Sequence, residues 1–88
     1  MNRFPLVYRE KPYVVYSMQY NDDNDYSSLE HWVNSHGGKL YKTEDILILE
    51  QDSFVDYIEK GDYIVREMNG NLYSCSEKTF LYRFERVD

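Results

Sequence analysis

Residues 61–76 read GDYIVREMNGNLYSCS and hold the strongest folding signal in the chain. Two runs rich in β-branched and aromatic residues flank the pair Asn69-Gly70. This pattern favours a two-residue type I′ turn, because both central residues of that turn need positive φ. We therefore predict an antiparallel hairpin in which Met68 lies opposite Asn71.

A two-residue turn also fixes which side chains share a face of the hairpin. It pairs Arg66 with Tyr73, so we expect a cation–π contact between them. One face is predicted to carry Ile64, Arg66, Tyr73 and Cys75, and the other face Tyr63, Val65, Glu67 and Leu72.

Four strand patterns precede the hairpin. In residues 11–20, KPYVVYSMQY, apolar side chains recur at every second position, which predicts a strand that begins near Pro12. The run ILIL at 46–49 is flanked by charges and is typical of a central strand covered on both faces. Residues 39–42 are a candidate for a short strand, and residues 53–58 are expected to form a strand or an extended turn.

One helix is predicted between the first two of these strands, over about 28–36. Ser27 and Glu30 have the S-x-x-E spacing of a capping box, and Gly37 with Gly38 supplies a C-terminal stop. A stripe at helical spacing is expected to pack on a sheet with its tryptophan largely buried: Leu29, Trp32 and Val33.

After the hairpin, SEKTF (76–80) is expected to form a polar turn or a single helical turn. FLYRFERV (80–87) alternates like a strand. Together the elements predict an α+β fold: a small, mainly antiparallel curved sheet or partly open barrel of five to six strands, with one amphipathic helix. The 88 residues suffice for a single domain, 1–88.

Charge and composition exclude several classes of protein. Sixteen acidic residues against ten Lys and Arg give a net charge of -6, which disfavours direct binding to nucleic acid phosphates. The lone Cys75 excludes an intramolecular disulfide and fits a reducing compartment. No apolar run approaches the roughly 20 residues of a membrane span, and MNRFPLVYRE lacks a signal-peptide core. A cytoplasmic protein without membrane contact is expected.

The middle of the chain is its acidic pole, with seven carboxylates and one lysine between Glu44 and Asp62. The chain also has ten tyrosines, a residue that is enriched at protein interfaces. We therefore predict a protein-binding surface formed by Tyr41, Glu50, Asp52, Asp56, Tyr57, Glu59, Asp62 and Tyr63.

Two motifs invite a catalytic interpretation, and each has a simpler one. Gly61-Asp62 resembles part of a phosphate loop, but a Gly-Asp pair before a strand is usually a turn. Cys75 is a possible nucleophile, yet no histidine lies near it in the sequence to activate it, so we expect a small buried residue. No catalytic residue is assigned.

Metal-binding patterns are equally weak. His31 and His36 are five apart and miss the i, i+4 spacing of a helical zinc site. NDDND at 21–25 lacks the glycine and the distant glutamate of a calcium loop. Glu50, Asp52 and Asp56 are alternative magnesium ligands of a nuclease, but spaced carboxylates are usually a solvated face. We expect no metal and no cofactor.

Motifs near both ends of the chain follow one pattern. The first comprises Tyr8, Lys11-Pro12, Val14-Val15 and Gln19-Tyr20; the second is GDYIVR at 61–66, followed by Gly70, Tyr73, Cys75, Phe80, Tyr82 and Glu85, with Trp32 between them. In this the chain resembles a family of small, functionally uncharacterised bacteriophage and prophage proteins, whose C-terminus reads GDWIVRGVKGEFYPCKPDIFEATYE. The chain departs from that pattern at Glu67, Asn69 and Ser74 and throughout its acidic middle.

The resemblance implies a setting, a phage genome and the cytoplasm of the bacterial host, and no reaction. The leading hypothesis is a non-catalytic phage protein that binds and modulates a host protein with a basic surface, such as a nucleic-acid-handling or antiviral-defence factor. The alternative is a virion or assembly accessory that docks on another phage protein or self-associates, as a homodimer for example. A third hypothesis is a small hydrolase or nuclease.

Overall fold

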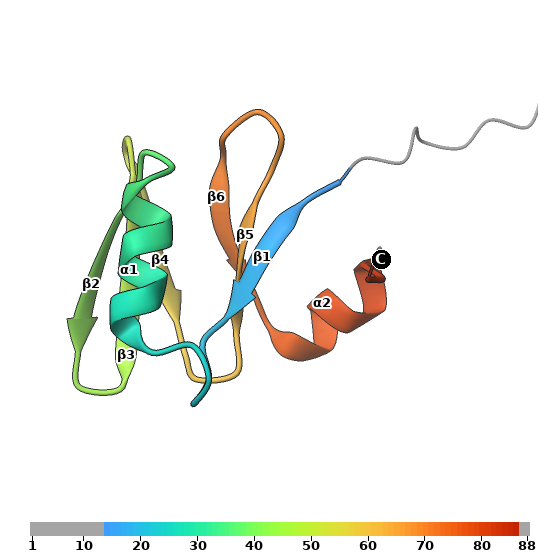
Figure 1. Cartoon of the computed structure of the whole chain (residues 1–88), viewed down its shortest axis with the longest axis horizontal. Coiled ribbons are helices and arrows are strands. Elements are labelled where there is room, and N and C mark those ends of the chain that lie inside the picture. The colour runs from blue at the N-terminus through green and yellow to red at the C-terminus, as the bar shows by residue number, and fades with distance from the viewer. Residues whose placement is uncertain (1–13, 87–88) are drawn as a thin grey trace, which may run out of the picture.

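The computed structural model describes residues 14–86, which form six strands and two helices (Figure 1). Their order is β1 (Tyr16–Gln19), α1 (Tyr26–Asn34), β2 (Lys39–Thr43), β3 (Ile46–Gln51), β4 (Phe54–Ile58), β5 (Tyr63–Arg66), β6 (Leu72–Cys75) and α2 (Glu77–Arg83). The predicted α+β class with antiparallel pairing is confirmed. The expected strand start at Pro12 lies outside the described residues.

The strands form two sheets of three, not one curved sheet, and these are not closed into a barrel. The first sheet has the order β1-β5-β6, and the second sheet has the order β2-β3-β4. The predicted strands at 39–42, 46–49 and 53–58 are confirmed as β2, β3 and β4. The second sheet is a simple meander, because Thr43 pairs with Ile46 and Gln51 pairs with Phe54 across two-residue turns.

The predicted hairpin forms from β5 and β6, but its register was wrong by one residue. Val65 pairs with Tyr73, and the loop has three residues instead of two. Gly70 N–H donates to Glu67 O and Glu67 N–H donates to Asn71 O, both at 2.9 Å. Gly70 has a φ of 94°, whereas Asn69 is not at positive φ, so the loop is a tight turn followed by a glycine bulge.

This register changes the predicted faces of the hairpin. Ile64 shares its face with Ser74, and Arg66 shares its face with Leu72. The expected contact between Arg66 and Tyr73 was therefore wrong. The guanidinium carbon of Arg66 instead lies 5.6 Å from the ring centre of Tyr16, its partner on β1.

The main core lies between the facing sides of the two sheets and α1. Alternation along each strand directs one set of apolar side chains inward, while Leu29 and Val33 of α1 close the space between the sheets. Its buried members are Tyr20, Leu29, Val33, Leu40, Leu47, Leu49, Ile58, Ile64 and Leu72.

The helix α1 begins earlier than predicted, and its cap is a different residue. Asp25 is the N-cap, and its carboxylate accepts a hydrogen bond from Ser28 N–H at 2.9 Å. The glycine stop is confirmed: Gly37 has a φ of 86°, and Gly38 N–H donates to Val33 O at 3.0 Å. Trp32 is only half-buried, contrary to the prediction, because it lies at the margin of the core.

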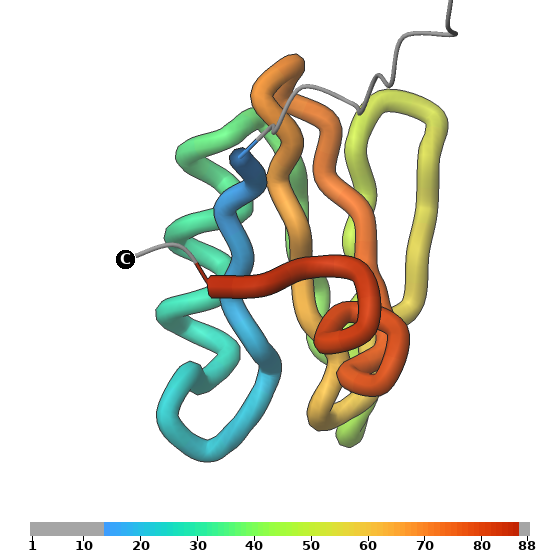
Figure 2. The backbone as a smooth tube through the Cα atoms, turned by 90° about the vertical axis from the view of Figure 1, so that its right-hand side faces the viewer, coloured from blue at the N-terminus to red at the C-terminus, as the bar shows by residue number. Residues whose placement is uncertain are grey.

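A second helix, α2, replaces the turn and strand predicted for residues 76–87. Ser76 caps it by accepting a hydrogen bond from Thr79 N–H, which converts the polar SEKT run into a helix start. Phe80 stacks on Tyr63, with ring centres 3.9 Å apart. Helix α2 therefore covers the outer side of the first sheet, away from the second sheet (Figure 2).

Side chains, not backbone pairing, join the two sheets where β4 and β6 meet. Gln51 donates to Gly70 O and accepts from Leu72 N–H, each at 2.9 Å. Asp56 accepts from Ser74 N–H at 3.0 Å and from the Ser74 hydroxyl. These bonds satisfy the edge of β6 while leaving the two sheets separate.

Candidate protein-binding surface

The second sheet has one face that no other element within residues 14–86 covers. Helix α1 packs on the inner side of this sheet, which carries the buried residues Leu40, Leu47, Leu49 and Ile58. Helix α2 lies on the first sheet. Alternation sends the remaining side chains outward. We define the outer face as Lys39, Tyr41, Thr43, Ile46, Ile48, Glu50, Val55 and Tyr57.

The centre of the outer face is a cross-strand row of Tyr41, Ile48 and Tyr57. Tyr41 is 45% exposed, Tyr57 is 63% exposed and Ile48 is half-buried. Ile46 and Val55, on either side of the row, are 39% and 46% exposed. Five large apolar or aromatic side chains thus form a continuous solvent-exposed patch, which is a mark of interaction sites.

This arrangement corrects the interpretation of ILIL as a strand covered on both faces. Leu47 and Leu49 are fully buried, but Ile46 and Ile48 point to the outer face. The continuous apolar run hid this alternation, so Ile46, Ile48 and Val55 were missed as surface candidates. The register of residues 46–49 with both neighbouring strands shows which side chains share a face, and this register would have identified the three residues.

Acidic residues border the outer face at both ends. Glu44 and Asp45 form the turn between β2 and β3, and Asp52 begins the turn between β3 and β4. Glu59 follows β4, and Glu50 lies on the face itself. We call Glu44, Asp45, Glu50, Asp52 and Glu59 the acidic rim; all except Glu50 are exposed.

Two rim residues occupy unfavourable backbone conformations. Glu44 has a φ of 52° and Asp52 has a φ of 54°, in the left-handed region that favours glycine. A non-glycine residue held there costs on the order of 1 kcal/mol or more. The chain therefore keeps a carboxylate at each end of the outer face in spite of local strain.

The predicted site residues divide into two groups. Tyr41, Glu50 and Tyr57 lie on the outer face, and Asp52 and Glu59 belong to its rim. Asp56, Asp62 and Tyr63 do not join them.

Asp56 faces inward and has a structural position. Its carboxylate accepts from Tyr57 N–H at 2.9 Å and from both donors of Ser74. Asp62 accepts from Glu59 N–H at 2.9 Å within the turn before β5, as expected for a Gly-Asp turn. Tyr63 stacks against α2 on the first sheet. Spacing in the sequence grouped these residues, but strand alternation and the turn separate them.

The remaining chemical candidates of the sequence are the metal ligands, Cys75 and the two histidines. Within residues 14–86, no group of three or more His, Cys, Asp and Glu side chains is arranged to hold a metal ion. Cys75 is buried, and burial raises the pKa of its thiol. His36 packs edge-to-face on Trp32, with ring centres 5.5 Å apart.

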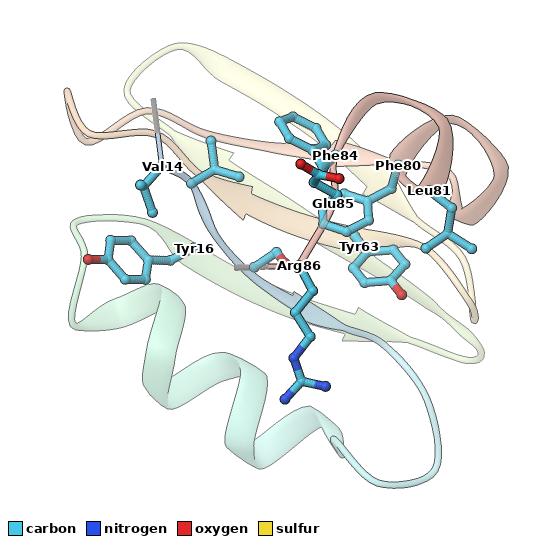
Figure 3. Close-up of a pocket in the computed structure, with 10 residues that line it drawn as sticks. Val14, Tyr16, Tyr63, Phe80, Leu81, Phe84, Glu85 and Arg86 are labelled. Atoms are coloured by element: carbon cyan, nitrogen blue, oxygen red, sulfur yellow. The ribbon is translucent and has the colours of Figure 1, made fainter. Parts of the chain in front are cut away.

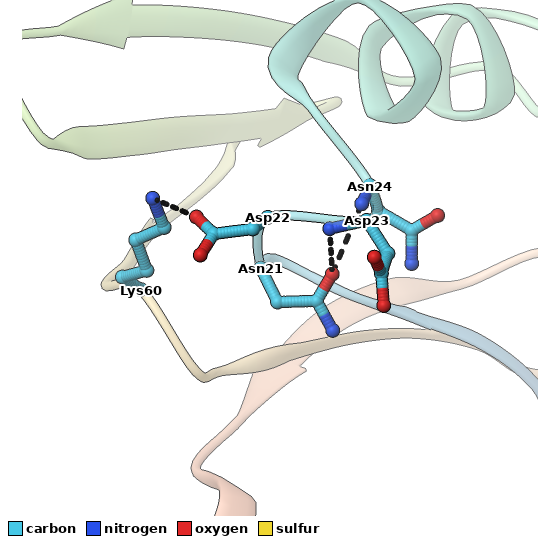
Figure 4. A network of polar contacts seen from close by, with 5 residues as sticks. All are labelled: Asn21, Asp22, Asp23, Asn24 and Lys60. Atoms are coloured by element: carbon cyan, nitrogen blue, oxygen red, sulfur yellow. Dashed lines mark hydrogen bonds and ion pairs between the residues drawn. The ribbon is translucent and has the colours of Figure 1, made fainter.

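The NDDND loop is held by its own side chains (Figure 4). The Asn21 side-chain oxygen accepts from the backbone N–H groups of Asp23 and Asn24 at 2.9 and 3.0 Å. Asp22 pairs with Lys60 at 2.9 Å, and this lysine lowers the pKa of the Asp22 carboxyl. This exposed ion pair connects the loop before α1 with the turn that precedes β5.

Neither protein-family models, nor curated proteins, nor solved structures show a significant match to this chain. None of the helices within the described residues is long and apolar enough to cross a bilayer.

Proposed function

We propose that this chain is a non-catalytic protein that binds and modulates another protein through its outer face. The observation that carries the proposal is the row of Tyr41, Ile48 and Tyr57, which no described element covers and which lies between two turns with carboxylates at positive φ. Aromatic residues in the centre and charges at the edge match the anatomy of protein interfaces.

The charge of the surface indicates the partner. The acidic rim favours a protein whose own surface is basic and surrounds an apolar centre, since complementary charges steer association. The resemblance of the terminal motifs supports a phage or prophage origin and a host protein encountered in the bacterial cytoplasm. A nucleic-acid-handling or antiviral-defence factor has the basic surface that this requires.

The proposal is tested by affinity purification from infected bacteria with three versions of the chain: wild type, Tyr57→Ala and Tyr82→Ala. Tyr82 is 91% exposed on α2, so its replacement is a matched control for the loss of a surface tyrosine. We expect quantitative mass spectrometry to find a host protein that the wild type and the Tyr82 variant retain and the Tyr57 variant loses. Capture that does not depend on Tyr57 contradicts the proposal, and capture of virion proteins alone favours the assembly alternative.

A further inference from the structure

Each of the two sheets has two edge strands, and three of the four edges are closed by a specific contact. Tyr26 donates its hydroxyl to Leu40 O on β2 at 2.8 Å. Asp56 accepts from Tyr57 N–H on the edge of β4 and from Ser74 N–H on the edge of β6. Closing such edges prevents other chains from pairing with them.

Within the part of the chain that the structure describes, the edge of β1 is closed only at its end. Tyr20 directs both its backbone groups toward the β5 side, donating to Asp62 O and accepting from Gly61 N–H. In an antiparallel pair these groups alternate, so those of Ser17 and Gln19 point away from β5. Asn24 covers Gln19 O at 3.1 Å. The edge groups of Ser17 have no partner among residues 14–86, and neither Lys nor Pro protects this stretch.

A groove of about 540 Å³ adjoins this open edge. Figure 3 shows Val14 and Tyr16 on one side of it and the rings of Phe80 and Phe84 on the other. Tyr16 is 52% exposed, although its side chain is largely apolar. Proteins that bind a peptide by strand addition need two features. An open strand edge supplies backbone hydrogen bonds for affinity, and a neighbouring apolar groove receives alternate side chains of the peptide.

The lining of the groove carries one cation and one carboxylate, Arg86 and Glu85, but the elements around it have a net positive charge. The elements that border it, β1, β5, α2 and the segment up to residue 86, carry four cations against two carboxylates: Arg66, Lys78, Arg83 and Arg86 against Glu77 and Glu85. The Nε atom of Arg66 is buried and has no hydrogen-bond acceptor among residues 14–86, and the Arg66 guanidinium lies over the ring of Tyr16, which is on the edge strand β1. This position suits a carboxylate.

We propose that the edge of β1 binds an extended peptide segment of a partner protein, in which an acidic side chain alternates with apolar ones. The peptide pairs with the backbone of Ser17, places an apolar side chain in the groove and directs its carboxylate toward Arg66. This site is on the first sheet and is independent of the outer face.

The test begins with a displayed library of random ten-residue peptides, selected on the immobilised full chain. We expect enriched sequences in which Asp or Glu alternates with apolar residues. The most enriched peptide is then synthesised with a fluorescent label, and its affinity is measured by fluorescence anisotropy. Ser17→Pro removes an N–H that no described residue uses, whereas Ser17→Ala keeps it. The Pro variant should bind at least about tenfold more weakly, because about 1.4 kcal/mol corresponds to a tenfold change, and the Ala variant should bind normally.

A peptide modification tests the same bonds without altering the protein. Methylating the peptide nitrogens that face β1 should abolish binding, and methylating the alternate nitrogens should not. Arg66→Met should remove the preference for acidic residues, while Tyr57→Ala should leave peptide binding unchanged. The proposal is overturned if no peptide is enriched, if both methylation patterns bind equally, or if the acidic preference persists without Arg66.

Discussion

At the scale of single residues, the same chemical group has different roles depending on the strand face that it occupies. Asp52 and Asp56 are four residues apart in one acidic run, yet Asp52 is exposed in a turn while Asp56 accepts hydrogen bonds from both sheets. A carboxylate that satisfies edge amides contributes to stability, whereas an exposed one contributes charge.

Replacing Asp56 with alanine should therefore destabilise the fold. The change leaves Ser74 N–H and Tyr57 N–H without their acceptor, and we expect a loss of about 1.5 to 3 kcal/mol in the free energy of unfolding. Urea denaturation followed by circular dichroism measures this loss. Asp52→Ala is the control and should stay within about 0.5 kcal/mol. Equal stability of the two variants would contradict the bridging role of Asp56.

Cys75 gives a pH prediction. Burial raises the pKa of its thiol above the ordinary cysteine value of 9.0, so the folded state holds the thiol proton more tightly than the unfolded state. The contribution of the protonated thiol to the free energy of unfolding is fully present below pH 9.0 and falls as the pH rises above that value. The difference in unfolding free energy between wild type and Cys75→Ala should be constant from neutral pH to pH 8 and should shrink above pH 9. A constant difference across the whole range would exclude the effect.

At the scale of elements, turns and helix ends decide where the chain departs from local preference. The two hairpin turns of the second sheet have acidic residues at positive φ, where glycine is favoured. The glycine bulge of the β5–β6 loop, by contrast, follows local preference. Among residues 14–86, non-glycine residues at positive φ thus occur only at the ends of the outer face, where we propose the binding site.

Glycine at the strained turn positions should stabilise the fold. We expect Glu44→Gly and Asp52→Gly each to raise the free energy of unfolding by about 1 kcal/mol, because glycine removes the left-handed penalty. Thermal unfolding checks this. The control is Asn69→Gly, which relieves no strain and should lower the melting temperature slightly. Once a partner is known, the stabilised variants should bind it less well, since each loses a rim carboxylate.

The margin of α1 is a second test at this scale. Trp32 is half-buried, so Trp32→Ala should cost about 2 kcal/mol, less than the roughly 3 to 5 kcal/mol of a fully buried aromatic side chain. Leu29 is fully buried on the same helix, and Leu29→Ala should cost about 2 to 5 kcal/mol. Chemical denaturation of both variants compares the two positions. An unchanged free energy of unfolding of the Trp32 variant would contradict the packing of this residue at the margin of the core.

At the scale of the whole molecule, charge and binding surfaces are separated. The stretch from residue 44 to 62 carries seven carboxylates and one lysine. The elements around the groove carry four cations and two carboxylates. The outer face and the β1 edge belong to different sheets. Because the two candidate surfaces lie on different sheets, substitutions on one of them test that surface without altering the other.

Association through the outer face should depend on salt. The Debye length shrinks from about 10 Å at 0.1 M salt to about 3 Å at 1 M, so the association rate with a basic partner should fall as salt rises. Replacing Glu44, Asp52 and Glu59 together by lysine should slow association, whereas Tyr57→Ala should mainly speed dissociation. Surface plasmon resonance at low and high salt separates these effects.

The matched control changes the net charge equally at another place, by replacing Asp23, Glu77 and Glu85 with lysine. If both triple variants associate at the same rate, long-range net charge and not the rim steers binding. Full affinity of the rim variant would eliminate the acidic surface as the docking site.

The sequence by itself determined the antiparallel α+β class, the positions of β2 to β6 and the glycine stop of α1, because these depend on local patterns of apolar and turn residues. It also grouped Tyr41, Glu50 and Tyr57 in one predicted surface, and the structure places these three on the same face of the second sheet. Only the tertiary structure decided the hairpin register, the helical state of residues 77–83 and the inward position of Asp56. A slip of one residue or a change of strand face alters the neighbours of a side chain without altering its local pattern. The helix at 77–83 has a local serine cap, but its packing depends on the stacking of Phe80 on Tyr63 of another element. The division into two sheets likewise rests on Gln51 and Asp56, whose partners lie 18 to 21 residues away in the chain.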